Sequence, residues 1–215
     1  MGISFVSFVC NEENCVSGMI ECVRPIVDEI IIVDTGSTDK TIEIITPMVD
    51  KVIHHPFTNF AEVRTFTARQ ATEPWVLMLD ADERFLSDDL PRIKALTEEM
   101  DAPDVYKFYR KEWDNLENQP NKPDSLAAKQ NIDWYGSVFP RLFKNKSYIK
   151  WRNFVHERMF GYHQAAYLSI EDGPFIHHYS TIYKDPARYS SARAFYKELE
   201  MQQDKLRSRR GWQHK

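Results

Sequence analysis

The sequence contains few cysteines and no long apolar run. Cys10, Cys15 and Cys22 form no CxxC pair, and their odd, sparse number argues against a disulfide framework or a zinc knuckle. The longest wholly aliphatic runs, at residues 30–33 and 76–79, fall far short of the ~18–20 apolar residues that a membrane-spanning helix needs. These absences exclude a disulfide scaffold, a zinc finger and a transmembrane protein.

The first residues also lack the features of a targeting segment. No basic stretch is present there, and Asn11-Glu12-Glu13-Asn14 interrupts the first apolar stretch, which argues against a signal peptide. Myristoylation after Met1-Gly2 would need Ser or Thr at position 6, where Val6 stands. We therefore expect a cytoplasmic protein.

The composition is that of an ordinary globular protein. Of its 215 residues, 42% are hydrophobic and 28% are charged, which is typical of one domain, or one domain with an appendage. The net charge is −4, but residues 205–215 carry five basic residues and no acid, so the preceding 204 residues carry −9. We expect no nucleic-acid partner. The basic tail, which includes Trp212, is either a peripheral contact with an anionic membrane surface or acidic acceptor, or a solvated frayed end.

The first 84 residues alternate between strand-like and helix-like segments. The expected strands are residues 3–9, 29–34, 51–54 and 75–79. The expected helices are residues 15–23, 37–47 and 61–72. Such alternation, with nearly continuous apolar strands, predicts an α/β fold with a mostly parallel, Rossmann-like sheet flanked by helices.

The regular alternation of strand-like and helix-like segments ends after residue 84. We expect a helix over 88–100 capped by Ser87, a strand over 105–109 and a long loop over 112–131. A hairpin over 138–143 and 147–151, another strand within 167–176 and a helix from 184 to about 209 complete the prediction. The chain then consists of one domain over 1–183, with halves 1–84 and 85–183, followed by a helix and tail over 184–215.

Three polar loops follow the ends of expected strands. They are residues 11–14, 34–39 and 80–83. In an open α/β sheet, ligands bind outside the carboxyl ends of the strands. Three acidic strand ends meeting at one edge are difficult to explain by packing alone, so this edge is the candidate site.

The third loop, residues 80–83, gives the most specific indication of function. Asp80 and Asp82 are two residues apart at the end of a strand, so both carboxylates can face one point. Two such carboxylates repel unless a cation lies between them, and oxygen ligands select Mg²⁺ or Mn²⁺, which bind together with substrate phosphates. The alternative is a solvated acidic turn that caps the next helix.

The second loop has two compatible interpretations. Gly36 allows a sharp turn, and Ser37, Thr38 and Asp39 stand where a helix begins. In addition, Asp34 or Thr35 is a candidate for holding the base of a nucleotide.

Taken in order, these motifs resemble family 2 glycosyltransferases of the GT-A fold. The resemblance covers roughly residues 3–195 and rests on Asn11-Glu12-Glu13, on residues 31–41 and on Trp75-Val76-Leu77-Met78-Leu79-Asp80-Ala81-Asp82-Glu83. The motifs Phe60-Ala61-Glu62-Val63-Arg64, Pro140-Arg141-Leu142-Phe143 and Val155-His156-Glu157 are similar to those of the branch containing bacterial lipopolysaccharide-core glucosyltransferases and glycocin S-glycosyltransferases.

The resemblance implies roles for individual residues. Glu12 and Asp34 would contact the ribose and base of a UDP-sugar, and Arg64 would lie near the diphosphate. Asp80 and Asp82 would form the motif for Mn²⁺ or Mg²⁺, with Asp82 binding the ion directly. His178, preferred to His177, would complete metal or diphosphate binding. Glu157 would be the general base, with the pair Glu171 and Asp172 as its rival. The halves 1–84 and 85–183 would bind nucleotide and acceptor.

The sequence also departs from the family pattern. Thr35 stands where many members have a second acid, Thr65 follows the arginine where many have Asn, and the acidic pair ahead of a long helix has no clear counterpart. These departures leave the base contact and the general base open.

The expected function is therefore metal-dependent, inverting transfer of a hexose from a UDP-hexose, UDP-glucose or a similar donor, to a glycan, lipid-linked glycan or peptide. Residues 112–136 and 158–169 are the expected acceptor loops, where Trp113, Trp134 and Tyr135 either stack on the acceptor or pack in the core. The competing interpretations are a non-catalytic sugar-nucleotide- or glycan-binding domain and a haloacid-dehalogenase-type phosphatase. Glu83-Arg84 after the Asp-x-Asp pair disfavours the phosphatase.

Overall fold

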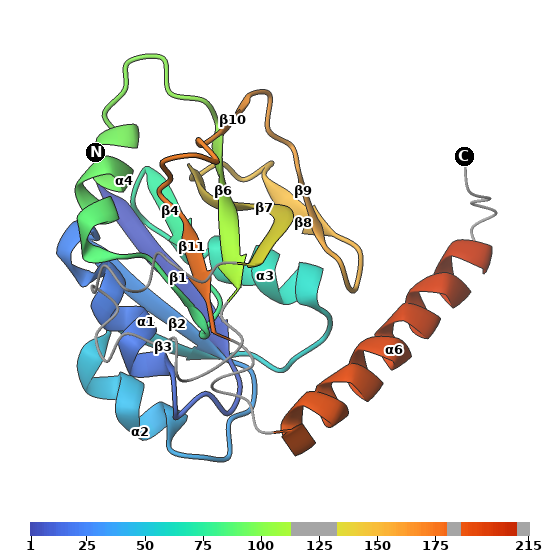
Figure 1. The fold of residues 1–215 in the computed structure, drawn as a ribbon. Helices are drawn as coiled ribbons and strands as arrows, with labels where there is room; N and C mark the ends of the chain where they lie inside the picture. The colour runs from blue at the N-terminus through green and yellow to red at the C-terminus, as the bar shows by residue number, and fades with distance from the viewer. Residues whose placement is uncertain (113–132, 180–185, 210–215) are drawn as a thin grey trace.

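One central sheet organises the chain. The computed structural model describes residues 1–112, 133–179 and 186–209, and its sheet has nine strands in the order β3-β2-β1-β4-β7-β6-β11-β5, with β10 beside β6 (Figure 1). The strands are β1 (Ile3–Val9), β2 (Glu29–Asp34), β3 (Lys51–His54), β4 (Trp75–Met78), β5 (Glu83–Arg84), β6 (Val105–Glu112), β7 (Asp133–Lys144), β10 (Ala165–Tyr167) and β11 (Ile176–His178). This confirms the predicted α/β class.

The first four strands are parallel. β1 pairs with β2 on one side, where Phe5 faces Ile30, and with β4 on the other, where Phe5 faces Leu77. β1, β2 and β4 are rich in β-branched and aromatic residues and are buried on both faces, as their nearly continuous apolar sequence predicts, whereas the edge strand β3 is partly exposed. β7 then enters antiparallel to both β4 and β6, so the sheet is mixed beyond β4.

Helices cover one face of the sheet. α1 (Val16–Val23), α2 (Thr41–Ile45) and α4 (Leu90–Leu96) bury their apolar side chains in the larger core cluster, which contains Phe5 and Leu77. In α1 the buried residues Val16, Met19, Ile20 and Val23 recur at helical spacing.

The opposite face is covered by α3 and a small hairpin. α3 (Phe60–Ala68) and the strands β8 (Lys150–Arg152) and β9 (Arg158–Phe160) contribute to the second core cluster, where Trp151 meets Phe143 edge-on at 5.3 Å. The side chain of Asn59 caps α3 by accepting a hydrogen bond from the backbone N–H of Glu62 at 3.0 Å.

The last helix, α6 (Pro186–Arg209), extends beside the body of the protein (Figure 1). Tyr196 stacks on Phe60 with ring centroids 5.1 Å apart, and Leu199 is buried. Gln203 accepts a hydrogen bond from the backbone N–H of Phe154 at 2.6 Å. The expected helix over 184–209 is present from residue 186, and residues 210–215 of the predicted basic tail lie outside the described residues.

Three predicted helices are shorter than expected. The helix expected over 37–47 is α2, followed by a 3-10 turn over Thr46–Met48, because residues 37–40 belong to the loop after β2. The helix expected over 61–72 ends at Ala68. The helix expected over 88–100 is α4 after a 3-10 turn over Ser87–Asp89, and Asp89 rather than Ser87 stands at the N-cap of α4.

The predicted hairpin over 138–143 and 147–151 was wrong. Residues 138–143 belong to β7, which inserts between β4 and β6, and β8 pairs instead with β9. The reason is burial: Leu142 and Phe143 are apolar on both faces of the strand and are fully covered only inside the central sheet. The predicted strand within 167–176 is replaced by two short strands, β10 and β11, at its borders. The long loop expected over 112–131 falls almost wholly outside the described residues.

Among the described residues, no helix combines the length and the apolar character needed to cross a membrane.

Candidate active site

The three acidic loops meet at one edge of the sheet. β2, β1 and β4 are adjacent and parallel, so residues 10–14, 34–41 and 80–83 all follow strand ends on the same side. The sequence prediction of a common edge is confirmed by this strand order.

The first two loops are joined by hydrogen bonds. Asn11 has a positive φ of 57°, and its side-chain oxygen accepts hydrogen bonds from the backbone N–H groups of Thr38 at 2.7 Å and Asp39 at 3.3 Å. The N–H of Asn11 donates to Ser37 Oγ at 2.9 Å, and the N–H of Glu12 donates to Thr41 Oγ1 at 2.7 Å. A left-handed backbone at Asn11 is thus held by direct bonds, and the two loops form one rigid wall of the site.

The predicted nucleotide-binding residues lie in this wall. The carboxylate of Asp34 accepts hydrogen bonds from the N–H groups of Gly36 and Ser37 at 3.1 to 3.3 Å, and His54 Nδ1 lies 3.3 Å from it. Thr35 Oγ1 donates to the carbonyl of Val9 at 3.0 Å. Asp34 therefore organises its own loop, and Thr35 ties the loop to the end of β1.

Glu12 lies beside a buried thiol. Cys15 Sγ donates to Glu12 Oε2 at 3.2 Å, and the Glu12 carbonyl accepts the N–H groups of Cys15 and Val16 at the start of α1. Burial raises the pKa of the Cys15 thiol well above its ordinary value, and the charge of Glu12 adds to this shift. Cys15 is therefore a protonated structural residue and no nucleophile.

Asp80 lies between two arginines. Its Oδ1 accepts a hydrogen bond from Arg64 Nη1 at 3.0 Å, and its Oδ2 accepts one from Arg141 Nη2 at 2.7 Å. Burial alone would raise the pKa of Asp80, but the charges of Arg141 and Arg64 outweigh burial, and the pKa lies far below its ordinary value. Asp80 is therefore held ionised and fixed in orientation.

Sequence reasoning gave no role to Glu83 or Arg141. Arg141 on β7 is 4% exposed and binds Glu83 Oε1 at 2.5 Å as well as Asp80. Burial raises the pKa of Glu83. Burial alone would lower the pKa of Arg141, but the charges of Asp80 and Glu83 outweigh burial, so the pKa of Arg141 is raised. The signals were present in the sequence, since Glu83 directly follows the Asp-x-Asp pair and Arg141 lies in the Pro-Arg-Leu-Phe motif.

Asp82 faces the predicted histidine. β11 runs antiparallel to β5, which places His178 opposite Glu83, and His178 Nε2 lies 3.5 Å from Asp82 Oδ1. The side chains of Asp82 and His178 are 6% and 15% exposed. His177, the neighbour on the strand, is 1% exposed and points to the other face. Of the two histidines, His178 is the one next to the acidic loop.

Glu157 also reaches this edge. Its Oε1 accepts hydrogen bonds from Arg64 Nε at 3.0 Å and Nη2 at 2.9 Å, so Arg64 joins Glu157 to Asp80. The rival pair lies elsewhere: Asp172 is 70% exposed and pairs with Arg92 of α4 at 3.5 Å. The geometry thus brings together Arg64, Asp80, Asp82, Glu157 and His178 and leaves Glu171 and Asp172 apart from them.

The donor set fits a divalent cation only in part. Within residues 1–112, 133–179 and 186–209, no group of three or more His, Cys, Asp or Glu side chains is arranged to hold a metal ion. Asp82 and His178 supply one carboxylate and one imidazole, while the oxygens of Asp80 are bound to arginines. Magnesium-type ions commonly bind through one or two protein ligands and complete their shell with substrate phosphates and water. Asp82 and His178 therefore fit a cation that binds together with a phosphorylated substrate.

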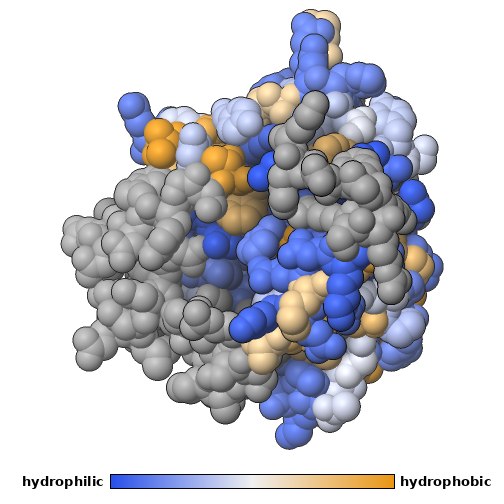
Figure 2. All heavy atoms as spheres, turned by 90° about the vertical axis from the view of Figure 1, so that its right-hand side faces the viewer, coloured by the Kyte–Doolittle hydropathy of each residue, from blue (hydrophilic) through white to orange (hydrophobic). Residues whose placement is uncertain are grey.

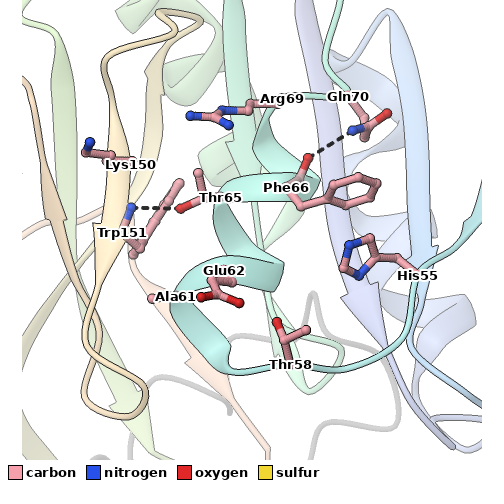
Figure 3. A pocket seen from close by; sticks show the side chains of 10 residues that line it. All are labelled: His55, Thr58, Ala61, Glu62, Thr65, Phe66, Arg69, Gln70, Lys150 and Trp151. Atoms are coloured by element: carbon pink, nitrogen blue, oxygen red, sulfur yellow. Dashed lines mark hydrogen bonds between the residues drawn. The ribbon is translucent and has the colours of Figure 1, made fainter. Parts of the chain in front are cut away.

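A pocket of about 630 Å³ lies away from these groups, on the outer side of α3 (Figure 3). Figure 3 shows α3 between His55 on one side and Lys150 and Trp151 of β8 on the other. The backbone N–H of Trp151 donates to Thr65 Oγ1 at 3.0 Å and closes one wall. None of the predicted site residues lines this pocket, so it is separate from the candidate active site.

Comparison with known proteins agrees with these features. The family model described as "Glycosyl transferase family 2" matches residues 4–170. An uncharacterized glycosyltransferase of Rickettsia typhi is 27% identical over 157 residues, which cover 60% of this chain and 54% of the relative. The lipopolysaccharide core biosynthesis glycosyltransferase LpsC of Rhizobium meliloti is 31% identical over 102 residues, which cover 42% of this chain and 36% of LpsC.

Among solved structures, TarS of S. aureus in complex with UDP-GlcNAc is similar, with a TM-score of 0.61 and 17% identity. The match covers 89% of this chain and 61% of the TarS chain. At this identity the likeness shows a shared fold. The chain spans about half the length of the curated relative from Rickettsia typhi.

Proposed function

The chain belongs to glycosyl transferase family 2, and from this premise we propose that it transfers a hexose from a UDP-sugar to an acceptor, with a divalent metal and with inversion at the anomeric carbon. The observation that carries the proposal is the Asp82–His178 pair beside the joined loops that follow β1 and β2. It supports a site in which the joined loops contact the nucleoside of the donor and the Asp82–His178 pair lies at its diphosphate.

The nucleoside part of the donor is assigned to the wall. Glu12 and Asp34 would contact the ribose and base, as the family resemblance implies, with Thr35 as a further candidate for the base. Asp34 already bonds to its own loop and Thr35 to the end of β1, so their contacts with the nucleoside would add to those bonds. TarS was solved with UDP-GlcNAc, which supports a UDP-sugar as donor; the hexose in this chain is proposed as glucose or a similar sugar.

The diphosphate part of the donor is assigned to Asp82, His178, Asp80 and Arg64. Asp82 and His178 would hold Mn²⁺ or Mg²⁺, and the imidazole nitrogen favours Mn²⁺ of the two. The ion, when bound, stabilises the negative charge that develops on the leaving diphosphate. Arg64 and Arg141 hold the carboxylate of Asp80 in place beside Asp82. The loop over residues 80–83 would therefore stay fixed while the donor binds.

Glu157 is the proposed general base. Its carboxylate is 17% exposed and is held by Arg64 rather than buried without a partner. In the reaction, the acceptor oxygen attacks the anomeric carbon as the bond to UDP breaks, UDP leaves with the bonding electron pair, and Glu157 takes the acceptor proton. A single displacement of this kind inverts the anomeric centre.

A Glu157→Gln variant tests this role. We expect turnover of a hydroxyl acceptor to fall about 100-fold, since general-base catalysis contributes at least that much, with the KM of the donor little changed. Glu62→Gln, an exposed glutamate on α3, is the matched control. If Glu157→Gln kept full turnover and an unchanged pH dependence, the general base would be another residue.

The acceptor is proposed to be a glycan, a lipid-linked glycan or a peptide. The name of LpsC, a lipopolysaccharide core enzyme, supports a glycan on a lipid. The division into a nucleotide-binding half at 1–84, an acceptor half at 85–183 and a C-terminal helix and tail stays a prediction, as does a cytoplasmic location. Trp113 lies outside the described residues, and the side chains of Trp134 and Tyr135 are likewise not described.

A panel of nucleotide sugars tests the donor and metal assignments. We expect UDP-hexoses to raise the Tm in Mn²⁺ and to release UDP slowly, and we expect chelation of the metal to abolish both effects. GDP- and CMP-sugars are the matched controls. Donor binding without any UDP release, with every acceptor class supplied, would favour the non-catalytic binding domain, and phosphate release from sugar phosphates would favour the phosphatase.

A further inference from the structure

The β8–β9 hairpin has two different faces. Trp151 pairs with Met159 in the register, and both point into the core. Their neighbours alternate outward: Lys150 pairs with Phe160, and Arg152 pairs with Arg158, all four exposed. We call the outer side, formed by Lys150, Arg152, Arg158 and Phe160, the basic face.

The basic face concentrates positive charge in an acidic protein. Residues 144–170 contain five Lys or Arg and a single acid, whereas the whole chain has a net charge of −4. No carboxylate of the described residues forms an ion pair with Lys150, Arg152 or Arg158. Like charges directly opposite on paired strands, as at Arg152 and Arg158, destabilise a hairpin. The pairing of Arg152 with Arg158 therefore costs folding stability.

Aromatic rings lie among these cations. The guanidinium of Arg152 lies 4.9 Å from the ring centroid of Phe160, which is 40% exposed. Tyr148, at the start of the hairpin, is 47% exposed, and its ring lies 6.1 Å from that of His163. Exposed aromatic rings next to Lys and Arg are the combination found where proteins contact the lipid–water interface.

A basic residue of α3 lies near the basic face. Lys150 and Arg69 line the pocket of about 630 Å³ on the outer side of that helix, together with the acidic Glu62 (Figure 3). Figure 2 is turned so that the right-hand side of Figure 1 faces the viewer, and hydrophilic residues predominate among the residues that are coloured there.

We propose that the basic face docks on an anionic lipid membrane surface. A bilayer presents many negative headgroups in one plane, and the four outward side chains of two paired strands lie in one plane as well. The turn of the same hairpin carries Glu157, so docking would hold the candidate active site next to the membrane. This contact is distinct from the one proposed for the tail at 205–215, and it does not depend on the proposed transfer reaction.

Vesicle sedimentation with the full chain tests the proposal. The probes are phosphatidylcholine vesicles with and without 30% phosphatidylglycerol, chosen to vary only the surface charge. We expect binding to the anionic vesicles alone, weakened by added salt. The Lys150→Gln, Arg152→Gln, Arg158→Gln triple variant should bind roughly 100-fold more weakly, since each cation near the surface contributes about fivefold.

The matched control is Arg24→Gln, Lys40→Gln, Lys51→Gln, which removes three exposed cations from other elements of the fold. It should keep at least a third of the native affinity. The hairpin variant should keep or raise its Tm, because it removes a like-charge pair. Unchanged vesicle binding in the hairpin variant would overturn the proposal. Absent binding by the native chain would do so too, as would binding to dextran sulfate with no binding to vesicles.

Discussion

Replacing Asp82 by Asn is expected to reduce metal-dependent UDP release about 1,000-fold. The change keeps the shape of the side chain and removes the carboxylate that lies 3.5 Å from His178 Nε2. A metal at a leaving diphosphate contributes several kcal/mol to the transition state, and three powers of ten correspond to about 4 kcal/mol. UDP release from UDP-hexoses in a Mn²⁺ titration measures the effect.

Asp88→Asn is the control for this prediction. Asp88 is an exposed aspartate six residues further on, and its loss should leave UDP release unchanged. The Tm of both variants without metal should lie close to that of the native chain. If Asp82→Asn kept full turnover with an unaltered Mn²⁺ dependence, the metal assignment would be wrong.

Replacing Arg141 by Met is expected to destabilise the fold by about 3–5 kcal/mol, the usual cost of removing one partner from a buried ion pair. Asp80 and Glu83 both bind this guanidinium, at 2.7 and 2.5 Å, and Glu83 is completely buried. Without Arg141 the charge of Glu83 would be uncompensated, and burial would raise the pKa of Glu83 further. For a chain of this size the loss should lower the Tm by about 10 °C, measured by calorimetry.

Two further variants separate electrostatics from packing. Glu83→Gln in the Arg141→Met background should recover part of the lost stability, since it removes the buried charge that Arg141 neutralised. Arg158→Met, at an exposed arginine of β9, should leave the Tm within about 2 °C of the native value. Equal losses from Arg141→Met and Arg158→Met would show that the network of Asp80, Glu83 and Arg141 contributes little.

The sequence predicted the features that depend on neighbouring residues. The apolar segments that became β1, β2, β3 and β4 have the expected limits to within one residue, because β-branched and aromatic runs bounded by polar turns specify strands locally. Alternation with helices implied a parallel sheet, and parallel strands place their following loops at one edge. The pairing of Asp80 with Asp82 on one side of a strand end followed from the same local geometry.

Local patterns were less accurate where tertiary contacts decide the outcome. The segment 138–143 looked like half of a hairpin, yet it became part of β7 because the sheet offered burial on both faces between β4 and β6. Three helices were shorter than predicted: α2 began late because residues 37–40 form the loop after β2, and α3 and α4 ended early. In these segments, burial and strand register decided the structure, rather than the intrinsic helix or strand preference of the residues.

By itself the sequence determined the strands of the first half and the carboxylates that end them. Only the tertiary structure decided which partners those carboxylates meet. Arg141 reaches Asp80 across 61 positions, Glu157 reaches Arg64 across 93, and His178 comes to Asp82 through the pairing of β11 with β5. Such contacts arise from sheet order and register, which a local pattern does not encode, and they turn a row of acidic strand ends into a site with fixed charges.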